Sequence, residues 1–353
     1  MIHILLTILG LWLLFLILRS MIRIALMNRH YRDFFAHTTG RTVYKTISFF
    51  LRKDRDKKAL HRILLWYFPA YMLSLILVYF VGAMVAFLLL YWGTGAVDTW
   101  RQALLASGSA LNTLGFATPT TVAGQFLAIP EGALGLGIVV FLFTFIPGYQ
   151  TVIRAREDKT SWLYVRTSKR PTGVELLEWC QRAGIAGNMR DVWESWEDWF
   201  RMLGDTHSVL PMLTMSPSVQ SGQSWVTAAA AVLDAAALAV SSMDAPDVEA
   251  ARVCLRTGTR ALLAISGAFG QTSKAAGPAT AHASKEWYDA TRTHLYSIGL
   301  PLKPAADREP QWREFLALRR EYQEALSFVA RQTFATMEDN LVDMQAGAAI
   351  HVQ

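Results

Sequence analysis

The sequence lacks the features by which most enzymes and metal proteins are recognised. Its 353 residues include only two cysteines, Cys180 and Cys254, and neither belongs to a paired Cys/His spacing that would bind zinc. There is no phosphate-binding glycine loop and no Gly-x-Ser-x-Gly motif. No helix carries repeated arginines of the kind found in voltage sensors. We therefore expect no enzyme, no bound cofactor and no resident metal.

Alternating strand patterns and internal repeats are also missing, so we expect an all-α protein. Hydrophobic residues make up 52% of the chain, which is high for a soluble protein and low for one that lies wholly in lipid. The apolar runs are nearly free of charge, whereas the C-terminal half is rich in Arg, Asp and Glu. These patterns predict a membrane part joined to a soluble helical part.

Positive charge is concentrated near the N-terminus. The net charge is +6, and the cations between residues 19 and 62 are Arg19, Arg23, Arg29, Arg32, Arg41, Lys45, Arg52, Lys53, Arg55, Lys57, Lys58 and Arg62. A nucleic-acid patch is one interpretation of such a cluster. Because apolar runs flank it on both sides, we favour a basic cytoplasmic or interfacial segment at 29–62 that contacts anionic lipids, with no nucleic-acid partner.

Three apolar runs are long enough to cross a membrane. The first lies in an N-terminal segment, 1–28, whose cations follow the apolar core and predict an anchor with its N-terminus outside. A helix lying in the membrane interface is the alternative for this run. The second run, 63–92, is apolar throughout and has aromatic residues at both ends. The third, 121–153, contains Pro130 and Glu131, which we expect to interrupt it near its outer end.

A short segment separates the second and third runs. Gly93, Gly95 and Asp98 end the second run, and residues 100–111 suit a short helix capped by Asp98 or Thr99. Such a helix has about three turns, too few to cross a bilayer. The backbone that follows it can lie at membrane depth only if it lines a pore or is buried in protein.

This loop carries the sequence Thr113-Leu114-Gly115-Phe116-Ala117-Thr118-Pro119. Its first four residues and its proline, placed between two spans, resemble the pore loop of the two-helix potassium-channel superfamily. A Glu-Gly-x-x-Gly stretch, Glu131 to Gly135, is similar to that of many bacterial members. The resemblance covers about a quarter of the chain, with an outer helix at 63–92, a pore helix and filter at 99–119 and an inner helix at 121–153.

The resemblance implies a homotetramer in which backbone carbonyls replace the water around a permeating monovalent cation. Potassium is the expected ion and sodium the alternative. The residues implied at the filter are Thr113, Leu114, Gly115, Phe116 and Ala117. Those implied at the pore mouth and its support are Thr118, Pro119 and Glu131. Those implied at a gate hinge are Gly132, Gly135, Gly137, Pro147 and Gly148.

Two positions depart from the family pattern. Ala117 replaces a glycine, and left-handed dihedrals would strain it. Thr118 replaces an acidic residue, which removes a ring of negative charge at the outer mouth. Both departures argue against high potassium selectivity. The ring of Phe116 is expected to pack against the pore helix, and Glu131 either hydrogen-bonds behind the filter or lies in water at the interface.

Residues 160–353 are predicted to form a helical cytoplasmic domain. Candidate helices are 174–183, 190–203, 224–243, 246–268, 279–297 and 311–344, with a connector at 299–310. Trp193, Trp196 and Trp199 recur at helical spacing and suit a core. Asp234 lies in an alanine-rich helix, and we expect it to pair with an arginine such as Arg252, Arg256 or Arg260.

The hypothesis that follows is a tetrameric cation channel of a plasma or inner membrane, multi-pass, with the N-terminus outside and the C-terminal domain in the cytoplasm. The cytoplasmic domain would gate the pore, through a ligand or partner that the sequence does not identify. The alternative is a non-conducting membrane-anchored sensor or scaffold whose helical domain binds a partner.

Overall fold

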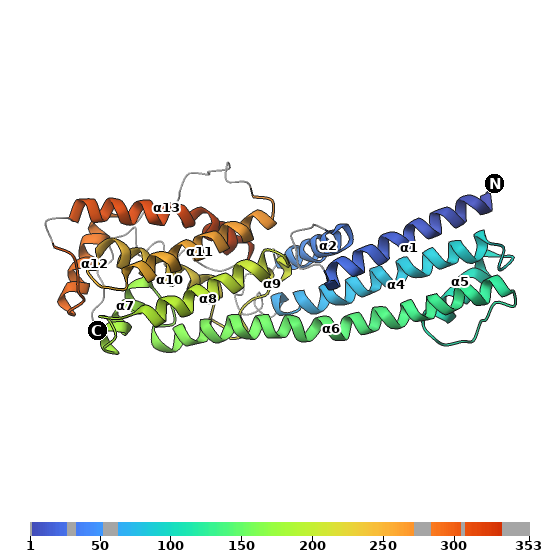
Figure 1. The fold of residues 1–353 in the computed structure, drawn as a ribbon, viewed down its shortest axis with the longest axis horizontal. Helices are drawn as coiled ribbons and strands as arrows, with labels where there is room; N and C mark the ends of the chain where they lie inside the picture. The colour runs from blue at the N-terminus through green and yellow to red at the C-terminus, as the bar shows by residue number, and fades with distance from the viewer. Residues whose placement is uncertain (1, 27–32, 52–62, 272–283, 305–307, 334–353) are drawn as a thin grey trace. The chain divides into compact units, whose positions relative to one another are not determined.

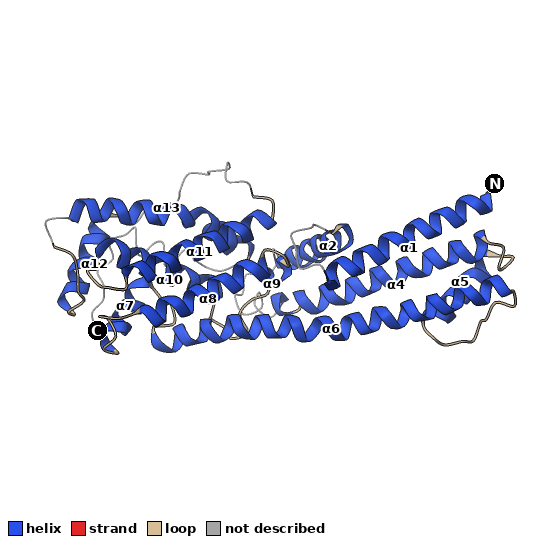
Figure 2. Ribbon diagram, viewed as in Figure 1, coloured by secondary structure: helices blue, strands red, loops and turns tan. Residues whose placement is uncertain are grey.

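The structure is a computed structural model that describes residues 2–26, 33–51, 63–271, 284–304 and 308–333. Within these ranges every regular element is a helix, apart from one isolated bridge between Met243 and Leu302 (Figure 2). The expected all-α class is confirmed for this part of the chain. Two compact units are present, one at Met1–Thr151 and one at Val152–Gln353.

The first unit contains α1 (Ile2–Leu26), α2 (Phe34–Leu51), α4 (Tyr67–Gly93), α5 (Trp100–Leu111) and most of α6 (Val122–Arg166). Helices α1 and α4 lie side by side (Figure 1). Small residues allow their close approach, because a Cβ at Gly10 would lie 2.9 Å from the Ala86 carbonyl oxygen and one at Gly82 equally close to Ile17. Helix α2 packs on α4 at Gly40 and Tyr71.

Helix α6 differs from the sequence expectation in two ways. It continues to Arg166, although we expected it to end at 153, and it passes through Pro130 and Glu131 without interruption. A proline removes one backbone hydrogen bond, but its fixed φ suits a helix and neighbouring turns hold the backbone in place. Stacking of Tyr149 on Phe68 ties α6 to the start of α4.

The second unit is a helical bundle around α10 (Trp225–Ser242). Its other helices are α7 (Gly173–Arg182), α8 (Arg190–His207), α9 (Pro211–Met215), α11 (Val248–Ala268), α12 (Lys285–Ser297) and α13 (Arg308–Gln332). Helices α7, α11 and α13 all contact α10 (Figure 1). All residues of α10 are buried, so this helix forms the centre of the core.

Most helix predictions for this unit agree with the structure to within a few residues. The short helix α9 was missed, and the expected connector at 299–310 is wrong at its end, because α13 begins at Arg308. Parts of some predictions lie outside the described residues. These are 279–283, 334–344 and the cations at 29, 32, 52, 53, 55, 57, 58 and 62.

Four described helices are long and apolar enough to cross a membrane: α1, the helical stretch 63–93, α6 and α10. Three of them belong to the runs that the sequence singled out, and these leave most of their side chains uncovered within the chain. Several such helices are typical of a multi-pass membrane protein.

Candidate functional site

The candidate site begins with the short helix α5, whose predicted bounds are confirmed. Thr99 is its N-cap: the hydroxyl accepts from the backbone N–H of Gln102 at 3.3 Å, and the Gln102 side chain accepts from the Thr99 N–H at 3.2 Å. This reciprocal pair is a capping box, which fixes where the helix starts. Twelve residues rise about 18 Å, well short of the ~30 Å apolar core of a bilayer.

The loop after α5 directs its N–H groups back toward the helix. The N–H of Thr113 donates to the carbonyl oxygen of Ala110 and that of Leu114 to the carbonyl oxygen of Ser109, both at 2.9 Å. The N–H of Ala117 donates to the Ser109 hydroxyl at 3.0 Å. Ser109 thus holds the loop through its backbone and its side chain, a role that the sequence alone did not reveal.

The carbonyl oxygens of residues 113–117 are in the opposite situation. None of them accepts a hydrogen bond from any residue that the structure describes. Thr113 and Gly115 adopt left-handed backbone angles, with φ of 56° and 71°. The glycine has an evident reason, since the left-handed region costs other residues ~1–2 kcal/mol. The loop therefore presents a run of backbone oxygens that no described part of the chain hydrogen-bonds.

Ala117 and Phe116 differ from what the resemblance suggested. Ala117 lies outside the left-handed region, so its methyl group causes no backbone strain. The Phe116 side chain is 66% exposed and therefore does not pack against the pore helix of its own chain. Thr118 is exposed as well, whereas Pro119 is buried next to Gly124.

Glu131 is completely buried, which overturns the alternative of a carboxylate in water. Its Oε1 lies 2.5 Å from the hydroxyl of Ser107 on α5, and the same hydroxyl lies 3.1 Å from the carbonyl oxygen of Met84 on α4. One carboxyl group therefore joins three helices behind the loop. Tyr91 on α4 is its other polar neighbour.

The glycines of α6 fall into two groups. A Cβ at Gly135 would lie 1.9 Å from the Leu111 carbonyl oxygen, and one at Gly132 would lie 3.4 Å from that of Ala110. These two glycines therefore let the inner helix touch the end of α5. Gly137 and Gly148 have open space around them. A hinge role for Gly132, Gly135, Gly137, Pro147 and Gly148 stays a prediction.

In the second unit, the end of α6 is fixed by a buried arginine that sequence reasoning missed. The Arg156 guanidinium donates to the carbonyl oxygens of Leu213 at 2.9 Å and Ser216 at 3.1 Å. It also lies 3.4 Å from Nε2 of His207 and over the ring of Trp225. Burial and the charge of Arg156 lower the pKa of His207 well below its usual value.

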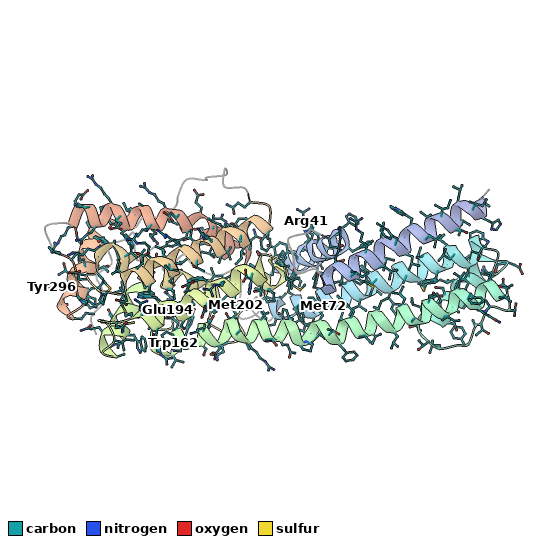
Figure 3. All side chains as sticks on the ribbon, in the orientation of Figure 1. Arg41, Met72, Trp162, Glu194, Met202 and Tyr296 are labelled. Atoms are coloured by element: carbon teal, nitrogen blue, oxygen red, sulfur yellow. The ribbon has the colours of Figure 1, made fainter. Side chains whose placement is uncertain are left out.

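The tryptophan cluster is a core, as the helical spacing predicted. Trp193, Trp196 and Trp199 are all buried. Trp162 of α6, labelled in Figure 3, lies 6.0 Å from Trp196 and 4.9 Å from Trp179 between ring centroids. The aromatic side chains thus pack the end of α6 against α7 and α8, which favours a structural role over a binding surface.

Asp234 pairs with an arginine as expected, but with Arg319 and not with Arg252, Arg256 or Arg260. Its Oδ1 accepts from Nε of Arg319 at 3.1 Å and from the hydroxyl of Tyr322 at 2.6 Å, both on α13. Arg252 instead approaches Glu249 and Glu314. Helix α13 lies far along the chain from α10, so sequence proximity favoured the wrong arginines.

Among the residues that the structure describes, no three His, Cys, Asp or Glu side chains are placed to hold a metal ion. Both cysteines are free and buried, and burial raises the pKa of Cys180 to about 12, which leaves it a poor nucleophile.

Comparison of the chain with protein-family models, curated proteins and solved structures gave no match.

Proposed function

We propose that this protein is a pore-loop cation channel that resembles the two-helix potassium-channel superfamily. The observation that carries the proposal is the asymmetry of the loop 113–117. Four of its five N–H groups, all but that of Phe116, bond to α5, while its carbonyl oxygens have no partner among the described residues. Partial negative charge on such oxygens can replace the hydration shell of a cation. Potassium is the expected ion and sodium the alternative.

One chain supplies one loop, and enclosing an ion needs several loops around an axis, so the channel is proposed as a homotetramer. The exposed side chains of Leu114 and Phe116 support this assembly, because neighbouring copies would cover them. The C-terminal end of α5 faces the loop, and the negative end of its helix dipole favours a cation there. The carbonyls of Thr113, Leu114, Gly115 and Phe116 would form the filter.

The proposed topology places the N-terminus outside and the second unit in the cytoplasm of a plasma or inner membrane, because the cations of 19–62 and those after residue 153 mark the inner side. The second unit would gate the pore through α6, which runs from the loop into that unit as one helix. Anionic lipids would bind at 29–62.

The test is ion flux through purified protein in liposomes, with potassium and sodium gradients compared. Gly115→Val places a branched side chain at a left-handed position and is expected to abolish flux. Gly95→Val is a matched control, since Gly95 has the same φ of 71° and equally open surroundings but lies outside the filter. Equal flux in the two variants would contradict the proposal.

Selectivity is measured in the same assay. The substitution Ala117→Gly is expected to raise the ratio of potassium to sodium flux, because it restores the family residue at the outer end of the filter. An unchanged ratio would show that residue 117 does not set selectivity in this pore.

A second candidate function is a membrane-anchored sensor or scaffold, favoured by the continuous core that the second unit has of its own, from Leu163 to Ala330. It predicts that a fragment covering 160–353 folds alone and keeps the activity. An unfolded or inert fragment, together with flux through the full chain, would rule this candidate out.

A further inference from the structure

Glu131 is a buried carboxyl group in an apolar part of the first unit. Its relative exposure is 0%, and no ion pair to it is found among the described residues. An isolated carboxylate transferred from water to an apolar interior costs so much free energy that such groups either pair with a cation or take up a proton. The burial of Glu131 therefore needs an explanation.

The hydrogen-bonding groups around it form a consistent chain when Glu131 carries a proton. Glu131 can donate from Oε1 to the Ser107 hydroxyl, which is then free to donate its own hydrogen to the carbonyl oxygen of Met84. With Glu131 ionised, the single hydroxyl hydrogen of Ser107 could bond either to the carboxylate or to the Met84 carbonyl oxygen, but not to both. Protonation thus satisfies both contacts at once.

Two buried oxygen atoms, one on Glu131 and one on Tyr91, also fit a protonated carboxyl group. Oε2 of Glu131 and the hydroxyl of Tyr91 are both buried and have no hydrogen-bond partner of normal geometry in the described part of the chain. Each side chain is nevertheless close enough to influence the charge of the other. The phenol of Tyr91 is a donor and Oε2 an acceptor, so the two unpaired atoms are chemically complementary. The titratable and polar groups facing Glu131 are thus Tyr91 and the Met84 carbonyl on α4 and Ser107 on α5.

Glu131 lies next to the part of α5 that holds the loop. Ser107 lies two residues before Ser109, which receives the N–H groups of the loop. On α6, the next residue, Gly132, and Gly135 one turn on both approach the end of α5. Glu131 therefore contacts α5 at the point where α5 supports the oxygens of residues 113–117.

We propose that Glu131 is a positioning residue of the pore, held as an uncharged carboxylic acid that joins α6 to α5 and α4 and so fixes the loop. This inference rests on the proposed channel function. Loss of the proton would place an unpaired charge between three helices. The resulting separation of α6 from α5 would displace the loop, so flux should fall as the pH rises through the ionisation of Glu131.

The first measurement is the infrared difference spectrum of the full-length protein in liposomes at neutral pH, wild type minus Glu131→Gln. We expect a carboxylic-acid C=O band. Wild type minus Asp234→Asn is the matched control, and it should show carboxylate bands only, because Asp234 pairs with Arg319. Carboxylate bands in the Glu131 difference spectrum would overturn the inference, whether or not the protein conducts.

The second measurement is flux. Glu131→Gln keeps the shape and a hydrogen-bond donor, so its flux should exceed that of Glu131→Ala and should no longer decline as the pH rises. Glu131→Ala and Ser107→Ala should each lower flux about tenfold, since each removes the hydrogen bond between α6 and α5. If wild type conducts and all three variants match it at every pH, the positioning role is wrong. If wild type carries no flux while Glu131 shows the acid band, the proposed channel function fails instead.

Discussion

Helices α4 and α10 are both apolar enough to cross a membrane, yet their surroundings differ completely. In the most apolar 18-residue window of each, 33% of α4 is buried within the chain and 100% of α10. Helix α4 is rich in Leu, Tyr, Val and Phe, whereas α10 is rich in alanine. Small side chains let other helices pack around α10 on all sides, whereas α4 buries one face and exposes Leu73, Leu77 and Val81 on the other. Hydropathy alone therefore does not separate a core helix from a membrane-facing one.

Each unit also contains one buried carboxyl group on an apolar helix, and the two are satisfied differently. Asp234 has a cation, Arg319, and a phenol, Tyr322. Glu131 has a hydroxyl and no cation among the described residues. A charge in a protein core can be stabilised by a side chain from a distant helix, but a side chain between lipid-facing helices has fewer such partners.

The largest expected effect comes from breaking the ion pair of the second unit. Asp234→Ala leaves the buried guanidinium of Arg319 without its carboxylate, so we expect unfolding free energy to fall by ~3–5 kcal/mol. Denaturant unfolding of the full chain in detergent, followed by tryptophan fluorescence, measures it. Asp198→Ala is the control, because its ion pair with Arg201 is exposed and should change stability by less than ~1 kcal/mol.

The second-largest effect concerns the close packing of α6 against α5 in the first unit. A methyl group at Gly135 would meet the Leu111 carbonyl oxygen, so Gly135→Ala must displace α5 and should cost ~1–3 kcal/mol. Gly137→Ala, two residues further on, has open space and should be neutral or slightly stabilising. Thermal unfolding in detergent compares the two. Equal melting temperatures would show that α6 does not approach α5 as described.

Acidification should lower the stability of the second unit through His207. Because the pKa of His207 is lowered in the folded state, the unfolded chain binds a proton more readily. Stability is therefore complete above pH ~6.5 and falls on acidification, by at most ~1.4 kcal/mol per pH unit. Denaturant midpoints at pH 7.5 and 5.5 measure the slope, and His207→Gln should reduce it. An unchanged slope in this variant would assign the effect to other groups.

The smallest effect concerns the start of α5. Thr99→Ala removes the capping box and should destabilise the first unit by ~1 kcal/mol, whereas Thr99→Ser retains the hydroxyl and should behave like wild type. Thermal unfolding of the two variants checks this. A larger loss for serine than for alanine would contradict the assigned cap.

Local patterns predicted helices well because the determinants of a helix are close in sequence. The bounds of α5 followed from a capping residue and a short apolar stretch, and α8 began at Arg190 as expected. The end of α6 at Arg166 was not predicted, because the charged residues after 153 suggested the end of a membrane span and not the end of a helix.

Within the candidate site, the sequence singled out the loop and Glu131 but not the serines of α5 that hold them. Thr113 and Gly115 were singled out from the motif, and both adopt left-handed backbone angles. The roles of Ser107 and Ser109 depend on which face of α5 meets the loop and α6. A serine in a helix gives no local sign of such a contact.

The sequence by itself determined that the chain is helical and where its apolar runs lie. It also determined that a short helix and a glycine-containing loop separate two of these runs. All of these features arise from periodicity, length and capping between neighbouring residues. Only the tertiary structure decided that Asp234 pairs with Arg319, that Arg156 is buried beside His207 and that Glu131 joins α6 to α5. Each of these contacts brings together residues from different helices, and the energy of burying a polar group is set by its neighbours in space.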